Sequence, residues 1–182
     1  VRPWTRAEMS AFVCADPSPD SAALGARLRR LRRRVMLRCI ARDLAGLATL
    51  DEVCTVMTTL AATALEFAQA DAERQMRARF GIPVGAGGSA QRLIIVGMGK
   101  LGGGELNVSS DIDLIFVHPE DGETRDGPRS LSNHEYFSSL GRAVIATLAE
   151  PTAEGYVFRV DMRLRPWGDP GPLAMSFDAL EE

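Results

Sequence analysis

The chain has 182 residues, 46% hydrophobic and 25% charged, a composition typical of a folded globular protein that excludes global disorder. The sequence shows no run of about 20 apolar residues and no basic-then-apolar leader, so we expect no membrane span and no secretory signal. Both ends look like cuts within a larger polypeptide. The three cysteines, Cys14, Cys39 and Cys54, fit no disulfide framework or zinc spacing, which favours a reduced cytoplasmic protein.

Charge is distributed unevenly along the chain. Residues 1–92 carry 14 arginines against 9 acids, whereas residues 93–182 carry 7 basic residues against 15 acids. Five arginines recur at helical steps of three and four residues: Arg27, Arg30, Arg34, Arg38 and Arg42. We interpret this stripe as a solvated face or one paired with the acidic second half, with a docking surface for an acidic protein as the alternative. The net charge of −3 and the low aromatic content argue against nucleic-acid binding.

The first eighty residues carry helical periodicity. One predicted helix begins at Asp20 or Ser21 as its N-cap and ends near Gly46. Its apolar positions are Leu24, Leu28, Leu31, Val35, Leu37, Ile40, Leu44 and Leu47. A second helix is predicted over Leu50–Phe80, with Asp51 as its cap. Residues 81–89 hold four glycines and a proline, so we predict a linker over 81–92 between a helical segment, 1–80, and a second unit, 93–182.

The second unit alternates strands with helices. Short apolar runs at 93–96, 112–117 and 156–161 predict buried strands, and residues 173–176 are expected to begin a fourth. A helix is predicted over 131–149, capped by Ser130 or Ser132. The elements do not follow a strict βαβ order, so we predict an α+β fold.

Two aspartates mark a candidate metal site. Asp111 and Asp113 flank the apolar Ile112, and because side chains alternate along a strand, both carboxylates should share one face. Two like charges so close are costly unless a cation lies between them, and carboxylate oxygens suit Mg²⁺ or Mn²⁺. Asp161, near the end of the 156–161 strand, is the candidate for a third ligand. An isolated Asp-x-Asp is more often a solvated pair.

A glycine-rich turn precedes the aspartates. Gly102 and Gly103 allow the backbone to approach a phosphate, and Lys100 is a candidate to contact it as well. Glycines that hold a phosphate beside carboxylates that hold its metal predict a nucleotide site. The glycines at 97, 99 and 102 also fit the dinucleotide-binding pattern, but no acid follows at the end of a second strand about 20 residues on.

Arginines surround the third carboxylate. If 156–166 stays extended, Arg159, Asp161, Arg163 and Arg165 share one face, where the guanidinium groups could hold phosphates in bidentate contacts. An ion-paired surface strand is the alternative.

Two long segments, 97–116 and 150–166, resemble the family of bifunctional glutamine synthetase adenylyltransferase/adenylyl-removing enzymes. The first reads GMGKLGGGELNVSSDIDLIF and the second contains YVFRVDMRLRP. The resemblance implies a polymerase-β-like nucleotidyltransferase palm, truncated at its C-terminus and preceded by a helical segment. It also implies regulation of nitrogen metabolism, with glutamine synthetase as protein substrate and the PII signal protein as a partner of the parent enzyme.

In that family one half removes AMP from a tyrosine of glutamine synthetase, using inorganic phosphate and releasing ADP, and the other half attaches AMP from ATP. Both segments resemble the removing half. The resemblance implies catalysis and binding of Mg²⁺ or Mn²⁺ by Asp111, Asp113 and Asp161. It also implies nucleotide or phosphate contacts from Ser110, Arg163 and Arg165, besides Gly102, Gly103 and Lys100. The adding half and a non-catalytic nucleotide-binding regulatory module stay open as alternatives.

Overall fold

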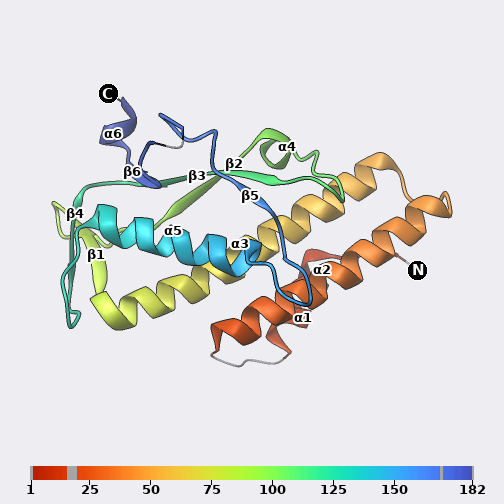
Figure 1. The fold of residues 1–182 in the computed structure, drawn as a ribbon, viewed down its shortest axis with the longest axis horizontal. Coiled ribbons are helices and arrows are strands. Elements are labelled where there is room, and N and C mark those ends of the chain that lie inside the picture. Colours follow the sequence, from red (N-terminus) through yellow and green to blue (C-terminus); the bar gives the residue numbers. More distant parts are fainter. Residues whose placement is uncertain (1, 16–19, 169, 182) are drawn as a thin grey trace.

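The computed structural model describes residues 2–15, 20–168 and 170–181, and is a mixture of helices and small sheets (Figure 1). This confirms the α+β class. The described elements, in chain order, are α1 (Arg6–Cys14), α2 (Ser21–Leu44), α3 (Leu50–Phe80), β1 (Ile82–Gly85), β2 (Ile94–Met98), α4 (Gly99–Gly102), β3 (Ile112–His118), β4 (Gly122–Arg125), α5 (Asn133–Ala149), β5 (Val160–Asp161), β6 (Ala174–Ser176) and α6 (Asp178–Glu181).

Two of the three predicted helix caps are confirmed. The Asp20 side chain accepts a hydrogen bond from the Ala22 amide at the start of α2, and Ser132 forms a capping box with Glu135 at the start of α5. The prediction that Asp51 caps α3 was wrong. Thr49 is the cap, because its backbone is extended and its hydroxyl accepts from the Glu52 amide, whereas Asp51 already lies in the first turn.

Helix α2 buries one face from Leu24 to Cys39, but not every apolar position of the predicted stripe lies on it. Leu24, Leu28, Leu31 and Val35 are in the core. The later positions of the predicted apolar stripe are largely exposed: Leu37 (62%), Ile40 (39%), Leu44 (83%) and Leu47 (61%). The periodicity therefore identified the helix correctly, but the buried face continues from Val35 to Cys39, and Leu37, Ile40 and Leu44 lie off it.

The predicted linker holds a strand. β1 pairs antiparallel with β4 in a two-stranded sheet, with Pro83 opposite Thr124. The expectation that residues 81–89 form only a loop was wrong because a proline is tolerated in a sheet of two edge strands. One hydrophobic cluster includes residues from both sides of this segment, among them Leu60 of α3 and Leu140 of α5. The division into units at 1–80 and 93–182 stays a prediction.

The main sheet is built around β3. β2 runs antiparallel to β3 on one side, while β5 and then β6 pair parallel with its other side. Ile112, Leu114 and Phe116 are fully buried on one face, and Figure 1 shows α5 and α3 lying along the sheet. The expectation that the 93–96 run is a buried strand was wrong in part: Ile94 and Val96 are 39% and 38% exposed, because β2 is an edge strand with only one face packed.

The third predicted strand is much shorter than expected. Only Val160–Asp161 forms a ladder, pairing with Ile112 and Asp113 of β3. Residues 152–155 close a turn, in which the Gly155 amide donates to the Thr152 carbonyl at 2.9 Å. Within the predicted strand, the Val157 and Phe158 amides donate to the Leu148 carbonyl of α5, at 2.8 and 3.0 Å, and not to a neighbouring strand. The chain turns again after Asp161.

By length and composition alone, helix α3 is long and apolar enough to cross a membrane. The sequence, which has no run of about 20 apolar residues, did not predict such a helix. Core helices of soluble domains pass the same test. Here α3 contacts α1, α2 and α5, and 39% of its most apolar window is buried in the fold.

Candidate active site

The three predicted carboxylates lie on two adjacent strands. Asp113 is opposite Asp161 in the parallel register of β3 and β5, and Asp111 immediately precedes β3. Because Ile112 is fully buried, strand alternation directs Asp111 and Asp113 away from the α5 side of the sheet. Parallel neighbours lie about 4.8 Å apart, so Asp113 and Asp161 are adjacent carboxylates. The structure thus brings the three residues to one end of one sheet face.

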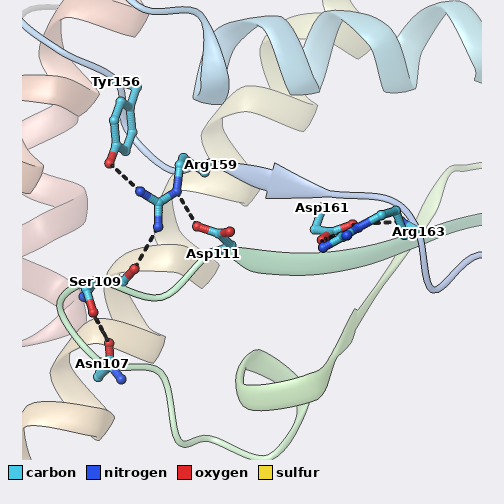
Figure 2. Close-up of polar contacts among 7 residues, drawn as sticks. All are labelled: Asn107, Ser109, Asp111, Tyr156, Arg159, Asp161 and Arg163. Carbon is cyan, nitrogen blue, oxygen red and sulfur yellow. Dashed lines mark hydrogen bonds and ion pairs between the residues drawn. The ribbon is translucent and has the colours of Figure 1, made fainter.

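Two of the three carboxylates are paired with arginines (Figure 2). Arg159 Nε donates to Asp111 Oδ1. Arg163 donates to Asp161 through Nε, at 3.0 Å to Oδ1 and 2.8 Å to Oδ2, and through its backbone amide at 2.8 Å. The Arg163 side chain and amide hydrogen bonds hold the pKa of Asp161 below its usual value, and the Asp111 hydrogen bond raises the pKa of Arg159.

The three carboxylates are suitable ligands for a divalent cation, but their side chains do not point toward one common position. Three carboxylates with oxygen ligands suit Mg²⁺ or Mn²⁺, and Asp113 and Asp161 are neighbours. Among residues 2–15, 20–168 and 170–181, however, no three acidic, histidine or cysteine side chains converge as a metal-binding group. Asp111 and Asp161 each face a guanidinium group (Figure 2). A cation would share those carboxylates with the arginines or displace them.

The glycine-rich turn contains a short helix, α4, that was predicted only as a turn. A Cβ at Gly102 would lie 2.5 Å from the Gly97 carbonyl oxygen, so this glycine allows α4 to pack against β2. Gly103, with Gly104, Glu105 and Asn107, lines a cavity against the first turns of α3. Lys100 is exposed on α4. Phosphate contacts from Gly102, Gly103 and Lys100 stay predictions.

The sequence did not single out Gly99 as a site residue. Its φ of +51° is a left-handed conformation that favours glycine, and a Cβ there would lie 2.5 Å from Asp113 Oδ2. The Asp113 carboxylate therefore rests directly against the Gly99 backbone. The sequence signal for this contact was the pattern of glycines at 97, 99 and 102, which was considered only as a dinucleotide-binding pattern.

The loop before β3 is held by its own polar side chains. Asn107 Oδ1 accepts from the Ser109 amide at 2.9 Å and from the Ser109 hydroxyl at 3.0 Å. The Ser110 hydroxyl accepts from the Asn107 amide at 3.3 Å. Ser110, predicted from the resemblance as a nucleotide contact, thus stabilises the turn that presents Asp111.

The predicted shared face of Arg159, Asp161, Arg163 and Arg165 was wrong because the strand ends at Asp161. Arg163 turns back onto Asp161. Arg165 instead bonds locally: Nη1 donates to the Met162 carbonyl at 2.8 Å, and Nε donates weakly to the Gly171 carbonyl at 3.4 Å. Phosphate binding by Arg163 and Arg165 stays a prediction.

The arginine-rich face of α2 is only partly solvated. Arg27 is buried, and the guanidinium groups of Arg34 and Arg38 lie 4.9 and 4.8 Å from the ring centres of Phe12 and Trp4. Arg42 bonds Glu52 of α3 at 2.8 Å. Of the five stripe residues, Arg30 and Arg34 are exposed, so the stripe is largely used to pack α2 against α1 and α3.

Sequence comparison places these features in a family. The family model described as glutamate-ammonia ligase adenylyltransferase matches residues 4–182. Relatives named bifunctional glutamine synthetase adenylyltransferase/adenylyl-removing enzyme include one from Chromobacterium violaceum, 55% identical over 180 residues, covering 98% of this chain and 20% of the relative. Another, from Nitrosomonas europaea, is 58% identical over 166 residues, covering 90% and 18%.

The chain thus spans about a fifth of the length of the curated relatives that it matches. The family model, in contrast, covers nearly all of this chain, from Trp4 onward. The chain therefore belongs to the glutamate-ammonia ligase adenylyltransferase family.

Proposed function

We propose that this chain carries the nucleotidyl-transfer site of an adenylyl-removing domain, built on a polymerase-β-like palm. The observation that carries the proposal is the pairing of Asp113 with Asp161 on adjacent strands, with Asp111 two residues before Asp113 on the same face. Such a set of oxygen donors suits a divalent cation and a nucleotide phosphate. The names of the relatives, which join adenylyl transfer and adenylyl removal, support the same reaction class.

The removing half is favoured over the adding half by two segments. Residues 105–110, ELNVSS, and 157–166, VFRVDMRLRP, resemble the removing half of the family. The substrate is then an adenylylated tyrosine of glutamine synthetase, and PII would act on the parent enzyme. The relatives' names cover both activities, so the adding half is the second candidate.

The proposed reaction is phosphorolysis. An oxygen of inorganic phosphate forms a bond to the AMP phosphorus, the bond from that phosphorus to the tyrosine oxygen breaks, and the products are ADP and tyrosine. The tyrosine leaves as a phenolate, whose conjugate acid has a pKa of about 10, and is then protonated from solvent. A Mg²⁺ or Mn²⁺ ion held by Asp111, Asp113 and Asp161 would supply positive charge at the transferred group.

The residues of the chain position the reacting groups. Incoming phosphate is already anionic, so a strong general base is not required, and charge stabilisation and orientation dominate. Arg163 would contact the incoming phosphate, and the exposure of its guanidinium group beside Asp161 supports this role. Gly99 leaves room for the Asp113 carboxylate at the base of the site.

The test is ADP formation from adenylylated glutamine synthetase with Mg²⁺, with and without inorganic phosphate, for this chain and for the full-length parent enzyme. We expect phosphate-dependent ADP. Asp113→Asn should abolish it while leaving the melting temperature near that of the wild type, because only a polar group at the site is changed. Activity within a few-fold of wild type in Asp113→Asn would refute the metal assignment, and ATP-dependent AMP attachment without phosphate-dependent removal would favour the adding half.

A further inference from the structure

The candidate site is connected to the arginine-rich helix by a continuous series of side-chain contacts. We propose that Arg159 is a positioning residue for Asp111, and that Arg32 of α2 holds Arg159 in place through the Tyr156 ring. This inference rests on the proposed function in one respect: the role of Asp111 in cation binding comes from that function.

Arg159 spreads its guanidinium group over three partners (Figure 2). Nε donates to Asp111 Oδ1, Nη2 donates to the Ser109 carbonyl at 3.0 Å, and Nη1 reaches the Tyr156 hydroxyl at 3.4 Å. The Arg159 carbonyl also accepts from the Ile112 amide at 3.0 Å. Arg159 thus contacts the Ser109 carbonyl and the Asp111 carboxylate, and its own carbonyl accepts the backbone hydrogen bond next to the β3–β5 ladder.

Tyr156 is in contact with two guanidinium groups. Arg32 of α2 lies 4.9 Å from the Tyr156 ring centre and Arg159 lies 6.0 Å from it, both within the range of cation–π attraction. Arg32 is half-buried, so its interaction with the ring is less screened than at the surface. A second contact joins the same elements, because Arg29 of α2 lies 3.9 Å from Glu154.

Asp111 needs such support. It precedes the strand, and its side chain is 45% exposed, so no packing fixes its carboxylate. The planar fork of Arg159 holds one oxygen of that carboxylate while its other nitrogen donors bind the loop and the ring. Arg32 touches neither Asp111 nor the loop in any hydrogen bond or ion pair among the described residues, so the contacts by which Arg32 could position Asp111 run through Tyr156 and Arg159.

The test uses Mn²⁺ alone, titrated by electron paramagnetic resonance into Arg32→Ala and Arg30→Ala. Arg30 is the matched control, because it is exposed on the same helix. Each variant removes one positive charge, which by electrostatics alone would favour cation binding. We expect Arg32→Ala to weaken Mn²⁺ affinity about threefold to tenfold relative to Arg30→Ala, the range expected for one cation–π contact. Equal or tighter binding by Arg32→Ala would overturn the proposal.

A second variant and a metal-independent measurement separate this proposal from the metal assignment. Arg159→Lys keeps the charge but loses the fork, and should also weaken Mn²⁺ binding. In the metal-free protein, the Ile112 and Ser109 amides should exchange hydrogen faster in Arg32→Ala than in Arg30→Ala. If the wild type binds no Mn²⁺, the metal assignment fails, and the exchange result alone decides the positioning role. Unchanged exchange at both amides would then refute it.

Discussion

Gly99 offers a direct test of how the glycine-rich turn serves the site. In Gly99→Ala the new Cβ would lie 2.5 Å from Asp113 Oδ2 and 3.3 Å from its Cγ, closer than carbon and oxygen atoms normally approach. The carboxylate can rotate away, which costs about 0.5–1.5 kcal/mol in an unfavourable rotamer. The left-handed backbone at +51° costs an alanine about 1–2 kcal/mol more. We expect about 1.5–3.5 kcal/mol of destabilisation and a displaced Asp113.

Gly104→Ala is the matched control for this prediction. Gly104 has a φ of +73°, so alanine carries a similar backbone cost, but nothing lies within 4 Å of the Cβ position. Urea unfolding should therefore show about 1–2 kcal/mol of destabilisation in Gly104→Ala. Mn²⁺ titration should show at least about tenfold weaker binding in Gly99→Ala only, since tenfold corresponds to about 1.4 kcal/mol. Equal Mn²⁺ affinity in the two variants would refute the role of Gly99 in placing Asp113.

Two further predictions concern the packed core. Burial lowers the pKa of His118 below its usual 6.5, so the unfolded chain binds the proton more readily, and the free energy of unfolding should fall as pH drops below about 6.5. Urea unfolding at pH 7.5 and 5.5 checks this, and an equally steep loss in His118→Gln would contradict it. In Gly141→Ala a Cβ would lie 2.6 Å from a ring carbon of the fully buried Phe116, so we expect about 1–3 kcal/mol of destabilisation, and an unchanged melting temperature would contradict this.

Local patterns predicted the regular elements well. The three- and four-residue apolar steps identified α2 and α3, and Leu50 and Phe80 are the observed ends of α3. Alternation around the buried Ile112 placed Asp111 and Asp113 on one face, since strand geometry depends only on neighbouring residues. Ser132 was correctly offered as a cap for α5, because a capping side chain binds an amide three residues away.

Features that depend on a distant partner were not predictable in this way. β1 forms because β4 pairs with it, and β2 leaves Ile94 and Val96 exposed because no strand or helix among the described residues covers that face. β5 ends at Asp161, where the chain turns and brings Arg163 back onto that carboxylate. Extended arginine spacing in the sequence gives no sign of this turn.

The sequence by itself determined the residue types of the site and the faces on which its aspartates lie, because both follow from chain-local chemistry and alternation. Only the tertiary structure decided which groups meet across elements. It set Asp113 beside Asp161 in register, placed Gly99 against Asp113, and brought both Arg32 and Arg159 to Tyr156. These contacts join residues on separate helices, strands and loops, and their geometry is fixed by strand pairing and core packing, which no local pattern specifies.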